Sequence, residues 1–141
     1  MTDFSAQLLG RTEKALNAIL DQQLAGIGIT EPQWVALTLT VTGGGTATTD
    51  VLAKISEALK VDTAEARARV GELADLGLVR VEDDGAVVAT DEGTARWQRV
   101  REALGPITEQ MWGDLPEADL AAAGRVLTVV LARANARLAA S

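Results

Sequence analysis

Cysteine, histidine and tyrosine are all absent from the 141 residues of the sequence. Without cysteine there can be no disulfide bond, thiolate metal site or thiol redox switch. Without histidine the chain lacks the commonest metal ligand and the only side chain that titrates near neutral pH when unperturbed. A catalytic nucleophile would depend on serine, threonine or lysine assisted by carboxylates alone. We therefore expect no enzyme activity, no metal site and no cofactor.

Long apolar runs are also missing, since no stretch approaches the roughly 20 consecutive apolar residues of a membrane span. No secretory signal is expected either, because the start, MTDFSAQLLGRTEK, lacks a basic segment followed by an apolar run. Proline is scarce, with three residues, while alanine is frequent and 48% of the chain is hydrophobic. This composition predicts a mainly helical, cytoplasmic protein with a substantial core.

Apolar residues at helical spacing predict two helices in the first third of the chain. The first covers roughly residues 3–25. The second begins at a capping box formed by Thr30 and Gln33, with Pro32 in its first turn, and is expected to end near Val41.

Two further helices follow a glycine-rich loop expected at residues 42–46. One begins at residue 48 or 49. The other begins after a second capping signal at Asp62–Glu65 and ends at Gly77, which suits a left-handed cap. Two short helices joined by so tight a turn predict a helix-turn-helix.

The apolar period then changes from helical to twofold. Residues 78–82 and 86–89 flank the turn Asp83-Asp84-Gly85, which is a strong hairpin signal between β-branched segments. A hairpin directly after a helix-turn-helix is typical of a wing.

The last third of the sequence predicts two more helices. Thr90 can cap a long fifth helix, in which Gly105-Pro106 should produce a kink or an interruption. The final helix is expected after Pro116 and continues to the C-terminus.

Several of these segments together resemble the MarR family of bacterial regulators. The similar pieces are residues 28–34 (GITEPQW), residues 52–61, Leu73 with residues 77–79, and residues 90–93 at the start of the fifth helix. The resemblance implies a mainly α protein with a small β-hairpin wing. It places a winged helix-turn-helix at about residues 30–92 and dimerisation helices at about residues 3–25 and 93–140, in one MarR-like domain. It also implies double-stranded DNA as a partner, and often a small-molecule pocket.

The terminal helices carry more apolar surface than so small a winged helix needs for its own core. We expect a second copy of the chain to cover this surface, giving a homodimer. The alternative is that the two helices pack only on each other within one chain. The expected interface residues are Phe4, Leu8, Leu120, Leu127, Leu131 and Leu138.

The second helix of the helix-turn-helix should present its outward side to DNA. Turning this helix by 100° per residue places Ala66, Val70 and Leu73 on the core side. Arg67 is the best candidate for contacting a guanine or a phosphate, whereas Arg69 lies closer to the core and could extend along the surface. The expected DNA-binding residues are Thr49, Lys54, Lys60, Thr63, Ala64, Arg67, Ala68, Arg69 and Arg80.

Trp34 and Trp97 are candidates for lining a pocket for a small aromatic effector. Core packing is the alternative interpretation, and it is the stronger one for Trp34, which is spaced with Ile29 for a hydrophobic staple.

Charge distinguishes two possible functions. The chain has a formal net charge of −7, and residues 48–92 contain five basic and eleven acidic side chains. The leading hypothesis is a ligand-responsive repressor that binds a short inverted repeat as a dimer. Because basic side chains drive DNA affinity, the alternative is a winged-helix dimer with weak or lost DNA binding that acts through a protein partner or small ligand.

Overall fold

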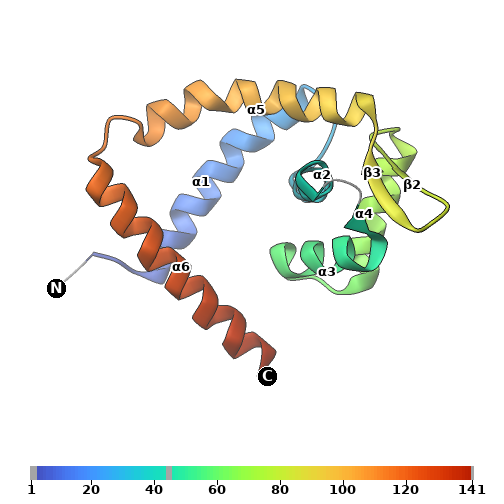
Figure 1. The fold of residues 1–141 in the computed structure, drawn as a ribbon. Coiled ribbons are helices and arrows are strands. Elements are labelled where there is room, and N and C mark those ends of the chain that lie inside the picture. The colour runs from blue at the N-terminus through green and yellow to red at the C-terminus, as the bar shows by residue number, and fades with distance from the viewer. Residues whose placement is uncertain (1–2, 44–45, 141) are drawn as a thin grey trace. The chain divides into compact units, whose positions relative to one another are not determined.

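The computed structural model describes residues 3–43 and 46–140, and the prediction of a mainly helical chain with a hairpin is confirmed (Figure 1). By its internal contacts the chain divides into two units, one ending at Leu104 and one starting at Gly105. The elements are α1 (Ala6–Ala25), α2 (Glu31–Gly43), β1 (Thr46–Ala47), α3 (Thr48–Leu59), α4 (Thr63–Asp75), β2 (Val79–Val81), β3 (Ala86–Ala89), α5 (Asp91–Trp112) and α6 (Glu117–Ala139).

Local capping determines where the first two helices begin. At α2 the expected capping box is present, because the Thr30 backbone N–H donates to Gln33 Oε1 at 3.0 Å and the Gln33 N–H donates to Thr30 Oγ1 at 3.4 Å. At α1 the helix begins at Ala6 and not at residue 3, because Ser5 is the N-cap and its hydroxyl accepts from the Leu8 N–H at 3.1 Å.

The strands form an antiparallel sheet in the order β1-β3-β2. The expected hairpin pairs β2 with β3 in a register that places Val79 opposite Ala89. The short strand β1 was not expected and pairs with the other edge of β3. A loop was expected at residues 42–46. Residues 42 and 43 belong instead to α2 and residue 46 to β1, while residues 44 and 45 lie outside the described part of the chain.

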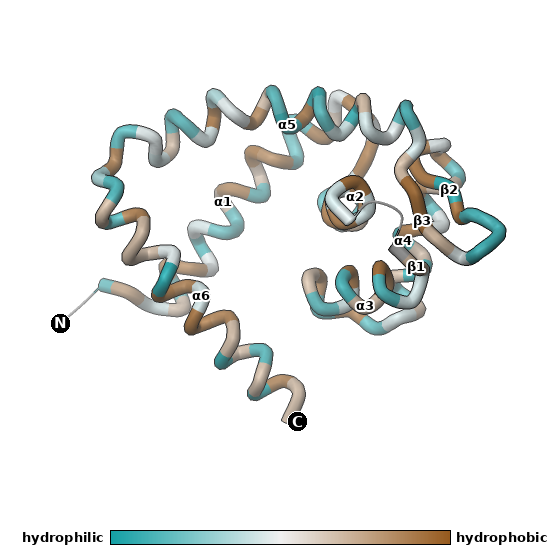
Figure 2. Tube along the Cα trace, in the orientation of Figure 1, coloured by the Kyte–Doolittle hydropathy of each residue, from teal (hydrophilic) through white to brown (hydrophobic). Residues whose placement is uncertain are grey.

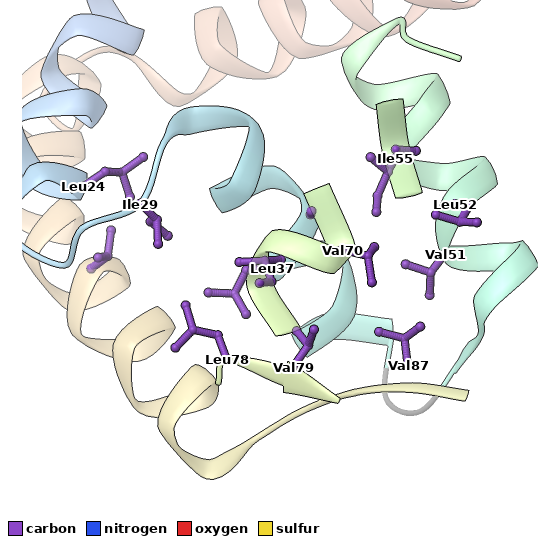
Figure 3. Close-up of a cluster of buried hydrophobic side chains, with 14 residues drawn as sticks. Leu24, Ile29, Leu37, Val51, Leu52, Ile55, Val70, Leu78, Val79 and Val87 are labelled. Atoms are coloured by element: carbon purple, nitrogen blue, oxygen red, sulfur yellow. The ribbon is translucent and has the colours of Figure 1, made fainter. Parts of the chain in front are cut away.

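The core of the first unit joins α2, α3, α4 and the sheet (Figure 3). Leu37 of α2, Ile55 of α3 and Leu73 of α4 have no exposed surface, and Leu78 closes the core from the start of the hairpin. This arrangement turns the opposite sides of α3 and α4 toward solvent.

Thr90 links the start of α5 to Gly77, which lies between α4 and the hairpin. Its hydroxyl donates to the Gly77 carbonyl at 2.6 Å and accepts from the Gly93 N–H at 3.0 Å, so the predicted cap is present. Gly77 itself has φ +76°, the left-handed conformation expected after α4.

Of the two outcomes expected at Gly105-Pro106, a kink or an interruption, the interruption is wrong, since α5 continues through both residues. Proline removes one backbone donor, and the carbonyl that loses its partner belongs to Glu102. Gly105, Pro106 and Glu102 are all exposed, so water can satisfy that carbonyl without a break in the helix.

The second unit contains the end of α5 and the whole of α6. None of the residues of α6 is buried, although apolar positions recur along the helix (Figure 2). None of the helices in the described residues is long and apolar enough to cross a membrane.

Candidate nucleic-acid interface

The turn between α3 and α4 is built by Lys60 and Asp62. Lys60 adopts a left-handed conformation with φ 57°, and its N–H bonds to the Ser56 carbonyl at the end of α3. Asp62 then caps α4, since its Oδ1 accepts from the Glu65 N–H at 2.8 Å. The short turn fixes α4 against α3, as in a helix-turn-helix.

The outward side of α4 consists mostly of small side chains. Ala66 and Leu73 have no exposed surface and Val70 is buried, so the predicted core side is correct. The exposed positions on the opposite side are Thr63, Ala64, Arg67, Ala68 and Gly71.

A surface hollow of about 500 Å³ lies along the N-terminal half of α4. It is lined by Val61, Asp62, Ala64, Glu65 and Ala68. The alanine side chains are too short to fill it, so a large partner could come close to the helix backbone at this point.

Arg69 is held beside the helix by carboxylates. Its guanidinium lies 3.1 Å from Glu72 and 3.8 Å from Glu65, and its side chain is 24% exposed. Gln33 of α2 donates to the same Glu72 carboxylate at 3.0 Å. Arg69 was expected among the DNA-binding residues, and in this structure its charge is directed toward the flank of α4.

Two other expected DNA-binding cations are also paired within the chain. Arg80 Nε, in β2, donates at 2.9 Å to Oε1 of Glu82, which directly follows the strand. Lys60 Nζ lies 3.1 Å from Glu57 Oε1 at the C-terminal end of α3. Both pairs are exposed, so phosphates would compete with these carboxylates at little cost.

Lys54 and Arg67 form no ion pair among the residues that the structure describes. Both are exposed, as is Thr49 near the start of α3. These three side chains are therefore available for phosphates or bases without first breaking an internal contact.

A contact not anticipated from the sequence joins α3 to the wing. The Thr48 N–H donates to the Gly85 carbonyl at 2.9 Å, and the Thr48 hydroxyl donates to the same oxygen. The preference of threonine for helix starts was visible in the sequence, but its partner 37 residues later was not. This contact fixes the wing tip relative to the helix-turn-helix.

Trp34 and Trp97, the candidate effector residues, stack on each other with ring centroids 6.3 Å apart and planes inclined by 20°. Trp97 Nε1 donates to Thr38 Oγ1 at 3.0 Å, and the Arg101 guanidinium lies 5.3 Å from the centre of the Trp97 ring. Both rings are half-buried against the core. The structure thus supports the packing interpretation for part of each ring and leaves another part accessible.

The candidate dimer residues are mostly exposed. Phe4 and Leu8 are 47% and 48% exposed at the start of the chain. On α6, Leu120 is half-buried, whereas Leu127, Leu131 and Leu138 are 42%, 55% and 59% exposed.

Glu31, in the first turn of α2, is a carboxylate whose titration is clearly altered. Burial raises the pKa of the Glu31 carboxyl, and the negative charges of Glu13 and Asp21 on α1 raise it further. No group of three or more acidic side chains within the described ranges is arranged to hold a metal ion.

Comparison with known proteins identifies the architecture. No family model matches the sequence, and no curated protein matches it significantly. Among solved structures, MarR from E. coli aligns with a TM-score of 0.71 and 17% identity, covering 93% of this chain and 96% of that one. The transcriptional regulator SlyA aligns with a TM-score of 0.79 and 18% identity, covering 96% of both chains.

BpsR from Bordetella bronchiseptica aligns with a TM-score of 0.71 and 24% identity, covering 91% of this chain and 94% of that one. The chain has the MarR fold. The similarity predicted from residues 28–34 and the later segments is thereby confirmed at the level of architecture. In this MarR fold α3 and α4 form the helix-turn-helix, and β2 and β3 form the wing.

Proposed function

We propose that the chain is a homodimeric transcriptional regulator that binds a short inverted repeat in DNA and acts as a ligand-responsive repressor. The observation that carries this proposal is the exposed outward side of α4 in a complete winged helix-turn-helix. In such motifs the second helix enters the major groove with its N-terminal residues at the base edges. Here those residues are Thr63, Ala64, Arg67 and Ala68.

Phosphate contacts are assigned to the elements beside α4. Thr49 and Lys54 of α3 are exposed and not ion-paired in the described residues, so they can bind the backbone directly. Lys60, Arg69 and Arg80 must first exchange a carboxylate for a phosphate. We therefore expect modest affinity that falls steeply with salt.

The dimer is proposed from the apolar surface of α6. Leu127 and Leu131 lie four residues apart, on one side of a helix that buries none of its residues. A second copy of the chain supplies a self-complementary cover under twofold symmetry. That symmetry would place two copies of α4 about one turn of DNA apart.

Effector binding is proposed near Trp34 and Trp97. In the structurally similar BpsR, DNA binding is regulated by 6-hydroxynicotinic acid. In this chain the stacked tryptophans and Arg101 offer an aromatic surface beside a cation, which suits a planar acidic molecule. Titration of tryptophan fluorescence with salicylate and hydroxynicotinate should produce quenching at millimolar concentration or below. An unchanged spectrum would count against an aromatic-responsive pocket at this position, though not against regulation by other ligands.

The proposal is tested by fluorescence anisotropy with duplexes from the DNA upstream of the protein's own gene and with random duplexes, at low and at physiological salt. We expect one upstream duplex to bind more tightly than the random ones. The variant Leu127→Glu/Leu131→Glu should lose both the dimer in light scattering and this binding, because it places charge in the interface. A folded wild-type monomer at micromolar concentration would contradict the dimer.

A second candidate function is a winged-helix dimer that acts through a protein partner. It is favoured by the five basic and eleven acidic side chains of residues 48–92, together with the internal pairing of Lys60, Arg69 and Arg80. Absence of binding to every duplex at low salt, with an intact dimer, would favour this function over DNA binding.

A further inference from the structure

The outward side of α4 offers almost no hydrogen-bonding groups to DNA. Asp62 is used as the helix cap, while Glu65, Arg69 and Glu72 form one ion-paired cluster on the flank. This leaves the Arg67 guanidinium, the Thr63 hydroxyl and two alanine methyl groups. To distinguish DNA sequences in the major groove, α4 must therefore rely on contacts between its methyl groups and the bases.

In the major groove an alanine methyl group recognises the C5-methyl group of thymine, and an arginine recognises guanine. Ala64 and Ala68 lie one helical turn apart, a rise of about 6 Å along the axis. Stacked bases follow each other at about 3.4 Å, so both alanines can contact thymines within about two base steps. The hollow along these alanines gives the bases room to approach, because Glu65, the long side chain in its lining, is paired with Arg69 on the flank of α4.

We propose that α4 reads thymine methyl groups through Ala64 and Ala68, next to a guanine read by Arg67. This inference rests on the proposed DNA-binding function and makes it more specific, because it states which bases each half-site contains. The preference for one sequence over another then comes from burying methyl groups between helix and bases, and the phosphate contacts of α3 and the wing set the position of α4.

The experiment starts with selection of tight-binding duplexes from a random 30-base-pair pool at low salt. In the selected duplex each thymine is then replaced, one at a time, by deoxyuridine, which removes only the methyl group. We expect two positions in each half-site at which this replacement weakens binding about fourfold, the equivalent of about 0.8 kcal/mol for one buried methyl group. Deoxyuridine outside the half-sites should have no effect.

A protein variant assigns the contact to its residue. Ala68→Ser adds one hydroxyl to the methyl carbon of the side chain, so the surface that faces the thymine methyl group becomes polar, and deoxyuridine at one of the two positions should no longer weaken binding. Ala95→Ser makes the same change at an exposed position of α5 and should retain both fourfold effects. Circular dichroism of both variants checks that the fold is kept.

Two results would overturn the inference, and they differ in what they say about the protein. If a duplex is selected and deoxyuridine at every position leaves its affinity unchanged, α4 does not read thymine methyl groups, while DNA binding itself stands. If no duplex is enriched and none binds at low salt, the proposed DNA-binding function fails, and this inference fails with it.

Discussion

In the winged helix, Leu37, Ile55 and Leu73 are completely buried, whereas α6 exposes six leucine and valine side chains by more than a third of their surface. Both regions show apolar residues at helical spacing in the sequence. In the winged helix, three helices and a sheet converge on one core (Figure 3). On α6, no residue reaches the same burial. Equal sequence patterns have thus led to different degrees of burial.

The difference shows what an apolar helical stripe can and cannot specify. Periodicity determines which residues share a side of a helix, but it does not determine which surface covers that side. A contiguous exposed apolar surface of this kind is uncommon on a monomer and marks an interaction site. The winged helix can therefore be treated as a complete folding unit, whereas α6 is the surface that a second copy would cover in the proposed dimer.

The largest expected effect is a loss of folding stability, and it appears when Leu37→Ala in the core is compared with Leu131→Ala on α6. Leu37→Ala creates a cavity in the core and should lower the free energy of unfolding by about 2–5 kcal/mol. Leu131→Ala should instead raise the dissociation constant of the dimer and leave the tryptophan fluorescence of the winged helix unchanged. Urea denaturation and sedimentation equilibrium measure the two quantities. If Leu131→Ala destabilised the monomer as much as Leu37→Ala, α6 would be packed within its own chain.

The next largest effect is also on folding stability, and it compares Gly93 at the start of α5 with Gly124 on α6. A Cβ at Gly93 would lie 1.9 Å from the Leu78 carbonyl oxygen, so Gly93→Ala must move the wing away from α5 and should cost about 1–3 kcal/mol. A Cβ at Gly124 of α6 meets no atom within 4 Å, so Gly124→Ala should be neutral or gain up to about 1 kcal/mol of helix stability. Thermal unfolding at low protein concentration compares them. Similar losses for both variants would mean that α6 is as closely packed as the junction of wing and α5.

Features set by neighbouring residues could be predicted from the sequence. The capping box of Thr30 and Gln33, the Asp62 cap, the Thr90 cap and the turn at Gly85 all depend on contacts a few residues apart, and all are present. The order of elements followed from these signals. The two residues of β1 could not be predicted, because a strand so short has no period to detect.

The partners of the charged side chains could not be predicted either. Gln33 donates to Glu72 across 39 residues, which depends on how α2 packs against α4. For this reason the sequence assigned Arg69 to DNA, while the structure places it beside Glu65 and Glu72. The stacking of Trp34 on Trp97 is likewise a consequence of the packing of α2 and α5.

A smaller effect is expected on DNA affinity. Glu82→Gln removes the carboxylate that holds Arg80, so Arg80 becomes free to bind a phosphate. Affinity for the selected duplex should rise several-fold at low salt, and the slope of log affinity against log salt should steepen by up to about one. Glu117→Gln makes the same charge change in the first turn of α6 and should leave both quantities unchanged. Equal gains for the two variants would indicate that only net charge matters and that the Arg80 pair has no specific effect on binding.

The smallest effect concerns the pH dependence of stability. Burial and the charges of Glu13 and Asp21 raise the pKa of Glu31, so its ionised form is disfavoured in the folded state. Protonated Glu31 and glutamine are both neutral, so Glu31→Gln and the wild type should be equally stable well below pH 4.5, the ordinary pKa of this group. As the pH rises through the raised pKa, the wild type loses this contribution, and Glu31→Gln should become more stable by less than about 1 kcal/mol. Denaturation from pH 3 to pH 8 measures this difference, with Glu117→Gln on α6 as the control for net charge. If Glu31→Gln instead became less stable than the wild type as the pH rises, the difference would have the opposite sign and would show that the charge of Glu31 stabilises the start of α2.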